Sequence, residues 1–550
     1  VNHMEKINED IREKLPYTHK IFFPFSKLTD VQEQTIPIIL AKKNALIISP
    51  TASGKTEAVI SPICERMVEK CNGNFNSRQL LLIYIVPTKA LVSDIYKRLE
   101  NKLSRLNITS ATKTGDANNF KINQPQNVLF TTPESCDSLL SRHPEIFKEI
   151  KFAIMDELHF LDNNYRGDQL RIILKRIAKI VNNPDELNYY AMSATINKPN
   201  EMCERYFINY EIIISKGSRK IIFATVDAGS NFKELGKIKN IFKERKIHRA
   251  IFFCNSRKTT IKITAQLKEI FERDDRIFEH HSAIDADDRK TIEREMARED
   301  NILSLCVATA TLEIGIDIGN IQAVVLIQPP LTVSSLLQRI GRGNRRTNKT
   351  TCFGVFELPE DKKVFAEMID KARKGIIEDI KYQPDMSVVI QQILSLTMQK
   401  RNENKGKLTH KKIHEFLDIL VDDPDHIDLI IEKIILDEYI EEFRGKIIPT
   451  PKLLDFDHKF GTRGRINVNI PASYMMKVID LSGNVIGEII RPTEKMKKIQ
   501  FASFKWDVNE IRKDRVIVNK TTGKTSIPQF TPHQDHGWFF SWLPDELKKL

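Results

Sequence analysis

The sequence has few cysteines, and none of the seven stands in the Cys-Xaa-Xaa-Cys spacing that builds zinc sites. Neither a structural zinc site nor a disulfide framework is therefore expected. Cys254 and Cys306 lie in apolar, strand-like runs, where a thiol acts as a small core side chain. The neighbouring His280 and His281 have no second cluster of metal-ligating residues near them, so we interpret them as structural residues too.

Long apolar runs are also absent. No stretch approaches the roughly 20 apolar residues that a membrane-spanning helix needs, and no basic leader followed by an apolar segment opens the sequence. These absences predict a cytoplasmic protein. The composition is that of a globular protein, with 41% hydrophobic and 29% charged residues. A formal net charge of +12 favours a polyanionic partner such as nucleic acid, although charge alone does not establish one.

A chain of 550 residues is too long for a single core, so several domains are expected. Its first part alternates helical segments with continuous apolar runs, which are typical of parallel strands covered on both faces. The strands predicted by this pattern are 80–86, 128–131, 152–156 and 189–192, followed by 249–254, 303–308 and 323–328. Two α/β domains in series, over residues 1–215 and 216–380, explain the repetition.

The pattern changes after residue 380. Three helices are predicted over 387–400, 408–420 and 425–436, and two strands then flank a turn at Arg444 and Gly445. Three helices followed by a hairpin are the outline of a winged-helix domain, which we place at 381–455. Short strands separated by turn residues indicate a small β-barrel-like domain at 456–550.

Residues 49–56 read Ser-Pro-Thr-Ala-Ser-Gly-Lys-Thr, between a predicted strand and a predicted helix. This is the pattern of a P-loop, in which backbone N–H groups surround phosphates at a helix N-terminus. Lys55 would reach the outer phosphates of ATP, and the Thr56 hydroxyl would hold Mg²⁺. The turn itself is expected to supply further phosphate contacts, from Thr51, Ser53 and Gly54.

Residues 156–159 read Asp-Glu-Leu-His at the end of a predicted strand. Asp156 is expected to hold Mg²⁺ through water, and Glu157 to act as the general base for the water that attacks the γ-phosphate. The structural alternative for Glu157 is a solvated acid at a strand end. For His159 we expect a role in coupling the nucleotide to other motifs, rather than proton transfer.

The second α/β domain contains Gln338 and the run Gly-Arg-Gly-Asn-Arg at 341–345. On a helix, Arg342 and Arg345 would share a face. Both are then expected to act as arginine fingers on the γ-phosphate, a contribution on the order of 10³–10⁵ in rate. Because each domain supplies half of the catalytic groups, closure of the cleft on ATP would assemble the site and convert hydrolysis into domain motion.

Taken in order, these motifs resemble the superfamily 2 helicases of the DEAD/DEAH-like kind, and among them the Lhr (large helicase-related) family. The resemblance rests on runs at 28–32, 87–91, 131–135, 156–159, 166–167, 307–317 and 338–345. It implies two tandem RecA-like domains and an ATP-dependent DNA helicase. Departures are Ala52 in the P-loop, Asn344 in the last motif, and an end at residue 550 that would leave out the family's long C-terminal extension.

The resemblance also implies roles for single residues. Gln32 would read the adenine, while Asp317 and Gln338 would contact the nucleotide. Ser193 and Thr195 would link hydrolysis to strand movement. The residues implied to line the nucleic-acid track, mainly through phosphate contacts, are Thr88, Lys89, Thr114, Gly115, Thr132, Ser256, Arg257 and Thr309. The structural alternative for each threonine is a turn or helix cap.

Aromatic residues gather near the end of the sequence, at Trp538, Phe539, Phe540 and Trp542. Base stacking, partner docking and packing onto the chain itself are all compatible with such a cluster. We favour core packing, both for this cluster and for Trp506, which lies in an alternating strand.

The sequence therefore predicts an ATP- and Mg²⁺-dependent motor that translocates 3′→5′ along single-stranded or tailed duplex DNA, in DNA repair or in antiviral defence. RNA or an RNA–DNA hybrid is the alternative substrate, because contacts to the 2′-OH are not evident from the sequence. Another alternative is a nucleotide-gated DNA-binding switch that recruits a separate nuclease, since no nuclease motif is visible. A purely structural scaffold is disfavoured by the complete set of catalytic residues.

Overall fold

The computed structural model describes residues 11–23, 27–50, 53–69, 75, 77–194, 196–215, 220–272, 274–281, 284, 286–298, 300–313, 319–343, 349–378, 382–403, 407–458, 465–470, 475–481, 485–490, 498–501, 504–511, 515–520 and 536–549. Contacts within the chain define two compact units. The first extends to Asn469 and includes the last segment from Phe539, and the second is Ile470–Trp538. No helix among these residues is both long enough and apolar enough to cross a membrane.

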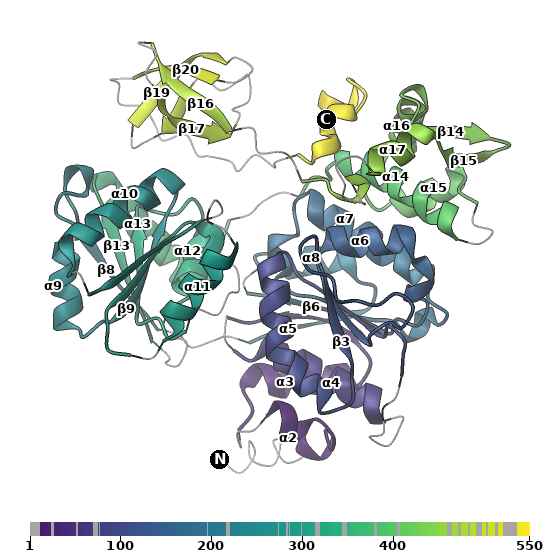
Figure 1. The fold of residues 1–550 in the computed structure, drawn as a ribbon, viewed down its shortest axis with the longest axis horizontal. Coiled ribbons are helices and arrows are strands. Elements are labelled where there is room, and N and C mark those ends of the chain that lie inside the picture. The colour runs from purple at the N-terminus through teal and green to yellow at the C-terminus, as the bar shows by residue number, and fades with distance from the viewer. Residues whose placement is uncertain are drawn as a thin grey trace. The chain divides into compact units, whose positions relative to one another are not determined.

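A seven-stranded parallel sheet forms the first α/β domain (Figure 1). Its strands follow the order β3-β4-β2-β5-β6-β1-β7. Their bounds are β1 (Asn44–Ile48), β2 (Leu82–Ile85), β3 (Ser110–Lys113), β4 (Val128–Thr131), β5 (Phe152–Met155), β6 (Asn188–Ser193) and β7 (Tyr210–Ile214). Alternate side chains enter two separate hydrophobic clusters, one on each face of the sheet. Burial on both faces explains why these strands are continuous apolar runs in the sequence.

Helices cover both faces of this sheet. Residues of α3, α4 and α5 belong to one hydrophobic cluster, and residues of α6, α7 and α8 to the other. The helices are α2 (His19–Phe22), α3 (Asp30–Leu40), α4 (Lys55–Glu69), α5 (Lys89–Ser104), α6 (Pro133–Arg142), α7 (Tyr165–Ala178) and α8 (Pro199–Tyr206).

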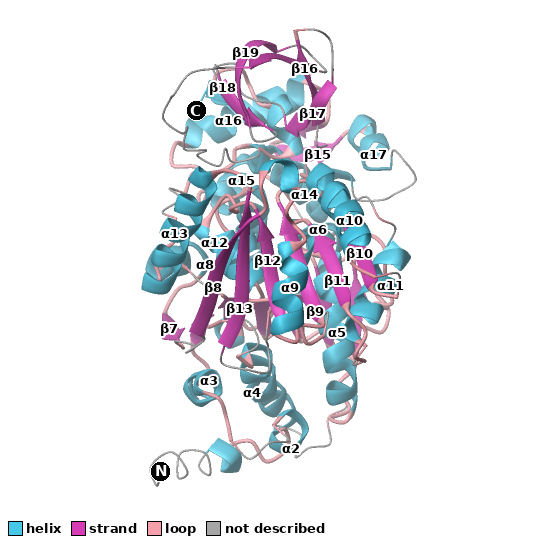
Figure 2. Ribbon diagram, turned by 90° about the vertical axis from the view of Figure 1, so that its left-hand side faces the viewer, coloured by secondary structure: helices cyan, strands magenta, loops and turns pink. Residues whose placement is uncertain are grey.

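A second parallel sheet, of six strands in the order β10-β11-β9-β12-β13-β8, forms the next α/β domain; Figure 2 shows its strands side by side. The strands are β8 (Lys220–Asp227), β9 (Arg249–Cys254), β10 (Arg276–His280), β11 (Ser304–Ala308), β12 (Ala323–Ile327) and β13 (Lys349–Phe356). The helices are α9 (Lys237–Glu244), α10 (Arg257–Ile270), α11 (Ala286–Ala297), α12 (Val333–Ile340) and α13 (Pro359–Lys374). The α/β class with two parallel sheets is thus confirmed, and Cys254 and Cys306 are buried in its core as expected.

Three helices and an antiparallel hairpin follow, in the order predicted for a winged helix. They are α14 (Ser387–Asn402), α15 (His410–Leu417), α16 (Pro424–Leu436), β14 (Ile440–Phe443) and β15 (Lys446–Pro449), with α17 (Pro451–His458) after them. The hairpin turns at Arg444 and Gly445, and both have positive φ, which suits the two-residue turns of β-hairpins.

A buried polar network joins this module to the first α/β domain. Arg176 of α7 and Asp137 of α6 form an ion pair of 2.6 Å with both side chains fully buried. From α14, Gln392 donates to Asp137 at 2.7 Å and Ser395 donates to it at 2.6 Å, while Gln399 accepts from Arg176 at 2.8 Å. Because these partners come from both domains, the contact is specific to one relative placement of α14 against α6 and α7.

The second unit is a five-stranded sheet of order β17-β16-β20-β19-β18. Its strands are β16 (Met475–Asp480), β17 (Val485–Ile490), β18 (Lys498–Phe501), β19 (Phe504–Ile511) and β20 (Arg515–Lys520). All pairings are antiparallel except β16 with β20. We predicted that Trp506 packs in a core, but its side chain lies outside the described part of the structure.

The C-terminal aromatic segment packs on the three-helix module. Trp542 stacks on Tyr439 with ring centroids 4.5 Å apart, and its ring lies 5.3 Å from that of Phe456 in α17. Phe539 is fully buried, and its backbone N–H donates to the Asn469 side chain at 3.0 Å. Phe539 and Trp542 therefore take the core-packing role that we favoured, and their partners Tyr439, Phe456 and Asn469 lie on both sides of the predicted boundary at 456.

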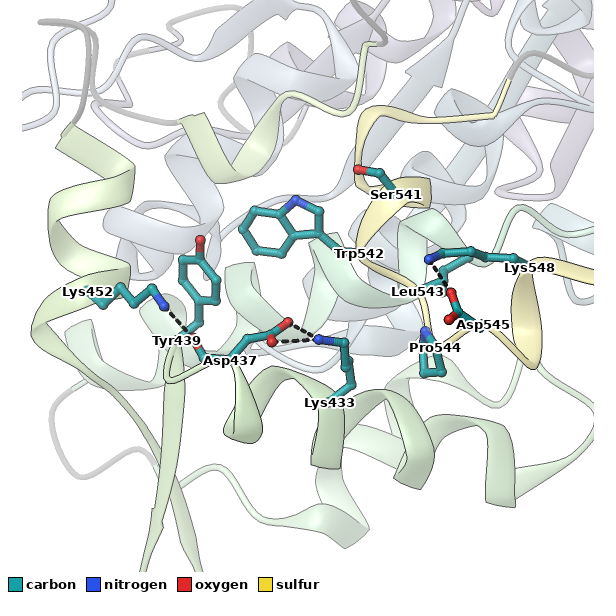
Figure 3. Close-up of a pocket in the computed structure, with 10 residues that line it drawn as sticks. All are labelled: Lys433, Asp437, Tyr439, Lys452, Ser541, Trp542, Leu543, Pro544, Asp545 and Lys548. Atoms are coloured by element: carbon teal, nitrogen blue, oxygen red, sulfur yellow. Dashed lines mark hydrogen bonds and ion pairs between the residues drawn. The ribbon is translucent and has the colours of Figure 1, made fainter. Parts of the chain in front are cut away.

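A hollow of about 580 Å³ lies beside this stack (Figure 3). Its three lysines are already engaged. Lys433 pairs with Asp437 at 2.5 Å, Lys548 pairs with Asp545 at 2.7 Å, and Lys452 donates to the Asp437 carbonyl at 2.7 Å. Since its cations are satisfied within the chain, we assign no ligand to this hollow.

Candidate nucleotide site and nucleic-acid face

The predicted P-loop connects β1 to α4 at the carboxyl edge of the first sheet. Lys55, the first residue of α4, is buried and donates from Nζ to the carbonyls of Ser49 (2.7 Å) and Ser193 (3.0 Å). Gly54 has φ +90°, so glycine is required by conformation, and a Cβ there would also displace the end of the Gln32 side chain, whose Nε2 would lie 2.5 Å away. Thr51 lies outside the described residues.

Gln32 contacts the P-loop directly. Its Nε2 donates to the Gly54 carbonyl at 3.4 Å, and its Oε1 accepts from the Thr29 backbone N–H at 3.0 Å, as in a helix capping box. Thr29 in turn donates from its hydroxyl to the Ser53 carbonyl at 2.9 Å. Sequence reasoning missed Thr29, although the spacing of Thr29 and Gln32 at the start of α3 is a capping-box signal. Adenine recognition by Gln32 stays a prediction.

Asp156 directly follows β5 and is buried. Its carboxylate accepts from Tyr84 Oη at 2.8 Å and from the Glu157 backbone N–H at 2.8 Å. The Thr56 hydroxyl is also a hydrogen-bond neighbour of the Tyr84 phenol, so the two predicted Mg²⁺ ligands have a common neighbour. Burial, reinforced by the adjacent Glu157, raises the pKa of Asp156 to about 6. Tyr84 was interpreted from the sequence only as part of a buried strand.

Glu157 adopts a left-handed conformation, with φ 50° and ψ 42°, that is uncommon outside glycine and asparagine. Burial acts to raise the pKa of Glu157, but Lys55 and, to a smaller extent, His159 and Arg342 lower it below the ordinary value. The carboxylate is therefore ionised at neutral pH, which is the state that a general base needs.

His159 links this carboxylate pair to β6. Its Nδ1 lies 2.9 Å from Ser193 Oγ, and the carbonyl of the same Ser193 accepts from Lys55. Burial lowers the pKa of His159 to about 4, so the imidazole is neutral at pH 7. A neutral ring held between Glu157 and Ser193 favours the predicted coupling role. Thr195 lies outside the described residues.

The order of the strands separates two groups of predicted site residues. Lys55, Asp156 and Ser193 follow or end β1, β5 and β6, which are neighbours in one half of the sheet. The other half consists of β3, β4 and β2, and these strands lead directly into a second group of polar residues. That group is Thr114 and Gly115 after β3, Thr132 after β4, and Thr88 and Lys89 shortly after β2.

In this second group the threonines have structural partners of their own. Thr88 Oγ1 accepts from the Leu91 N–H at 3.3 Å, and Thr114 Oγ1 accepts from the Ala117 N–H at 3.0 Å. Lys89 is exposed and pairs with Asp116 at 2.7 Å. The capping interpretation thus applies to Thr88 and Thr114, while the N-termini of α5 and α6 still point N–H groups to the same edge.

The second sheet repeats this arrangement. Ser256 and Arg257 follow β9 and begin α10, where Ser256 Oγ accepts from the Thr259 N–H at 3.1 Å. Thr309 follows β11, the neighbour of β9. The predicted nucleotide contact Asp317 lies outside the described residues.

Arg342 does not lie on a helix, which corrects the expectation that it shares a helical face with Arg345. Helix α12 ends at Ile340 and is capped by Gly341, because the two glycines at 341 and 343 do not sustain a helix. Arg342 is buried, and its Nη2 donates to the Glu313 carbonyl at 2.7 Å. Gln338, in the last turn of α12, donates to Ser334 Oγ at 3.4 Å. Arg345 is not among the described residues.

Two family models match the chain in this order. The model described as DEAD/DEAH box helicase matches residues 29–202, and the one described as helicase conserved C-terminal domain matches residues 233–347. These ranges contain the P-loop, the carboxylate pair and Arg342.

Similar proteins cover most of the chain. The ATP-dependent helicase Lhr-Core of Methanothermobacter thermautotrophicus is 27% identical over 94% of this chain, which spans 64% of that relative. The solved structure of Mycobacterium smegmatis helicase Lhr, bound to single-stranded DNA and AMP-PNP, is 21% identical and covers 79% of this chain and 60% of its own, with a TM-score of 0.68. The DUF1998 helicase MrfA bound to DNA is 18% identical, covers 93% and 73%, and has a TM-score of 0.64.

The chain thus spans less than two thirds of the length of the curated Lhr-Core relative. Its two parallel sheets have the tandem RecA-like fold of these solved structures. From the matched domains and the shared fold, the chain belongs to the DEAD/DEAH-like helicases of superfamily 2 and is similar over most of its length to their Lhr-Core members.

Proposed function

We propose that this chain hydrolyses ATP to translocate 3′→5′ along single-stranded DNA and to separate duplexes ahead of it, in DNA repair or in defence against foreign DNA. The observation that carries the proposal is the convergence of Lys55, Asp156 and Glu157 at the carboxyl edge of one half of a RecA-like sheet. The other half of the same edge carries hydroxyl groups, helix N-termini and a lysine, which are groups that bind phosphates.

The donor set fits a nucleotide with Mg²⁺. Asp156 and Lys55 are buried, the adjacent Glu157 carboxylate is only 12% exposed, and Glu157 Oε2 accepts no hydrogen bond from any described residue. The Thr56 hydroxyl and the Asp156 carboxylate supply the oxygen ligands that Mg²⁺ prefers. When bound, the ion would neutralise charge on the β- and γ-phosphates.

Each protein group has a distinct task in this proposal. Lys55 binds the outer phosphates in place of the Ser49 and Ser193 carbonyls that it now contacts. Glu157 orients the attacking water and takes its proton. Arg342 and Arg345 of the second domain stabilise the charge of the transition state, and Gln32, Asp317 and Gln338 contact the nucleotide. Movement of Lys55 is transmitted through Ser193 to His159.

The nucleic-acid substrate is proposed by similarity. The Lhr and MrfA structures are described as bound to single-stranded DNA and to DNA, respectively. In this chain, the residues proposed to hold the strand are Thr88, Lys89, Thr114, Gly115, Thr132, Ser256, Arg257 and Thr309. We propose by the same similarity the 3′→5′ direction, the role in repair or defence, and a separate nuclease as partner. RNA remains the alternative substrate.

Unwinding of tailed duplexes tests this function. Wild type should separate a duplex with a 3′ single-stranded tail and leave one with a 5′ tail paired, and this activity should require ATP. Glu157→Gln should abolish unwinding, while the same substitution at the exposed Glu186, which pairs with Lys151 at the surface, should not affect it. Unwinding of matched RNA substrates in preference to DNA would favour the alternative. Nucleotide-dependent DNA binding without any strand separation would favour the switch.

A further inference from the structure

Glu313 is a buried carboxylate in the second RecA-like domain that neither the predicted nucleotide contacts nor the predicted strand contacts include. It follows the short 3-10 helix η5 (Ala310–Leu312), which begins directly after the predicted strand contact Thr309. Its Oε1 accepts from Arg339 Nε at 2.6 Å and from Ser335 Oγ at 3.1 Å, and both donors lie on α12. This fixes the segment after Thr309 to the helix that precedes Arg342.

The main chain of the same residue holds the predicted arginine finger. The Glu313 carbonyl accepts from Arg342 Nη2 at 2.7 Å, and Arg342 is buried. Arg342 is also among the cations that lower the pKa of Glu157. The position of this carbonyl therefore helps to set the position of the guanidinium.

Arg339 extends the connection to a second strand end. It is buried, and its Nη1 donates to the Asn255 side chain at 2.8 Å. Asn255 precedes Ser256, another predicted strand contact, and its Nδ2 donates to the Pro329 carbonyl at 2.8 Å. The segment after Thr309 and the segment that leads to Ser256 are thus connected through one buried ion pair, Glu313 with Arg339.

We propose that Glu313 is a positioning residue, which transmits the placement of the bound strand at Thr309 to the Arg342 guanidinium. The inference rests on the proposed function, because it requires a strand on this face and ATP hydrolysis in the cleft. Glu313 touches neither ATP nor strand. Its side chain fixes the end of η5 to α12, and its carbonyl holds Arg342. Binding of the strand at Thr309 would thereby set the position of the Arg342 guanidinium.

The measurement is ATPase activity saturated with single-stranded DNA, with kcat and KM for ATP determined separately. Glu313→Ala should lower kcat on the order of 10- to 100-fold, the cost of displacing a catalytic group, and leave KM for ATP nearly unchanged. Glu313→Gln keeps an acceptor oxygen for Arg339 and Ser335 and should retain most of the kcat. Glu367→Ala, which removes an exposed glutamate on α13 of the same domain, should behave as wild type.

A double-mutant cycle separates positioning from general damage. In an Arg342→Ala background, Glu313→Ala should cause no further loss of kcat, because the group that it positions is already absent. Independent, multiplicative losses would overturn the proposal. If Glu313→Ala does not fold, Arg339→Lys provides the same test, since lysine keeps the charge but cannot bridge Glu313 and Asn255.

The wild-type control distinguishes failure of the proposed function from failure of the role assigned to Glu313. A wild type that single-stranded DNA does not stimulate would refute the proposed function, and this inference with it. A wild type that is stimulated, together with a folded Glu313→Ala that is equally stimulated, would overturn this inference alone.

Discussion

Replacement of His159 by glutamine should remove a defined part of the acid sensitivity of the folded protein. Burial of the imidazole lowers its pKa to about 4, from an ordinary value of 6.5. Lys55 and Arg342 act in the same direction, and Glu157 opposes them. The folded state therefore keeps the ring neutral where the unfolded state protonates it.

The sign and size follow from proton linkage. Between pH 6.5 and 4 the unfolded chain binds one more proton at His159 than the folded chain does, so stability falls as the pH falls through this window. For pKa values of 6.5 and about 4, the loss between neutral pH and pH 5 is about 2 kcal/mol. It approaches its full value of about 3 kcal/mol near pH 4.

Urea unfolding of wild type and His159→Gln at pH 7.5 and pH 5 measures this difference. Groups that do not interact with His159 titrate equally in both proteins, so the difference between the two pH-dependent losses reports on His159 and on the Glu157 carboxylate beside it. Glutamine also loses the contact with Ser193, but that cost is the same at both pH values. Equal losses of stability in the two proteins would refute the assignment of a buried, neutral His159.

Three further changes give separate outcomes. Glu157→Gln should lower ATPase kcat on the order of 10²–10⁴-fold with nucleotide binding retained, the range for loss of a general base; substantial residual turnover would contradict that role. Gly167→Ala should destabilise by about 3 kcal/mol in urea unfolding, because a Cβ would lie 2.3 Å from the Leu161 carbonyl oxygen. Arg176→Met should cost about 3–5 kcal/mol by leaving the Asp137 charge buried and unpaired; adding Asp137→Leu should recover part of this loss, and no recovery would argue against an uncompensated charge.

The strands and the nucleotide half of the site could be predicted because their signals are local. A continuous apolar run identifies β1 or β5. Gly54 is required by the backbone conformation of the turn, and Lys55 is required by the chemistry of phosphate binding. Asp156 and Glu157 follow from their position at a strand end. None of these inferences needs a distant part of the chain.

The predictions that failed or were missing depend on contacts distant in sequence. Helical spacing suggested a shared face for Arg342 and Arg345, but Gly341 ends the helix first. Tyr84 read as an ordinary strand residue, because its partner Asp156 lies on another strand. Likewise, nothing near Arg176 in the sequence indicates that its partners come from α14, more than 200 residues later.

Steady-state ATPase activity, measured with no nucleic acid, single-stranded DNA, duplex DNA and single-stranded RNA, tests the central claim most directly. The claim is that one half of the carboxyl edge of the first sheet binds a nucleic-acid strand while the other half of the same edge hydrolyses ATP. Strong stimulation by single-stranded DNA, lost in Lys55→Ala and in Glu157→Gln, is the predicted result. ATP hydrolysis at the same rate with and without every nucleic acid would contradict it, because the cleft and the strand-binding face would then be uncoupled.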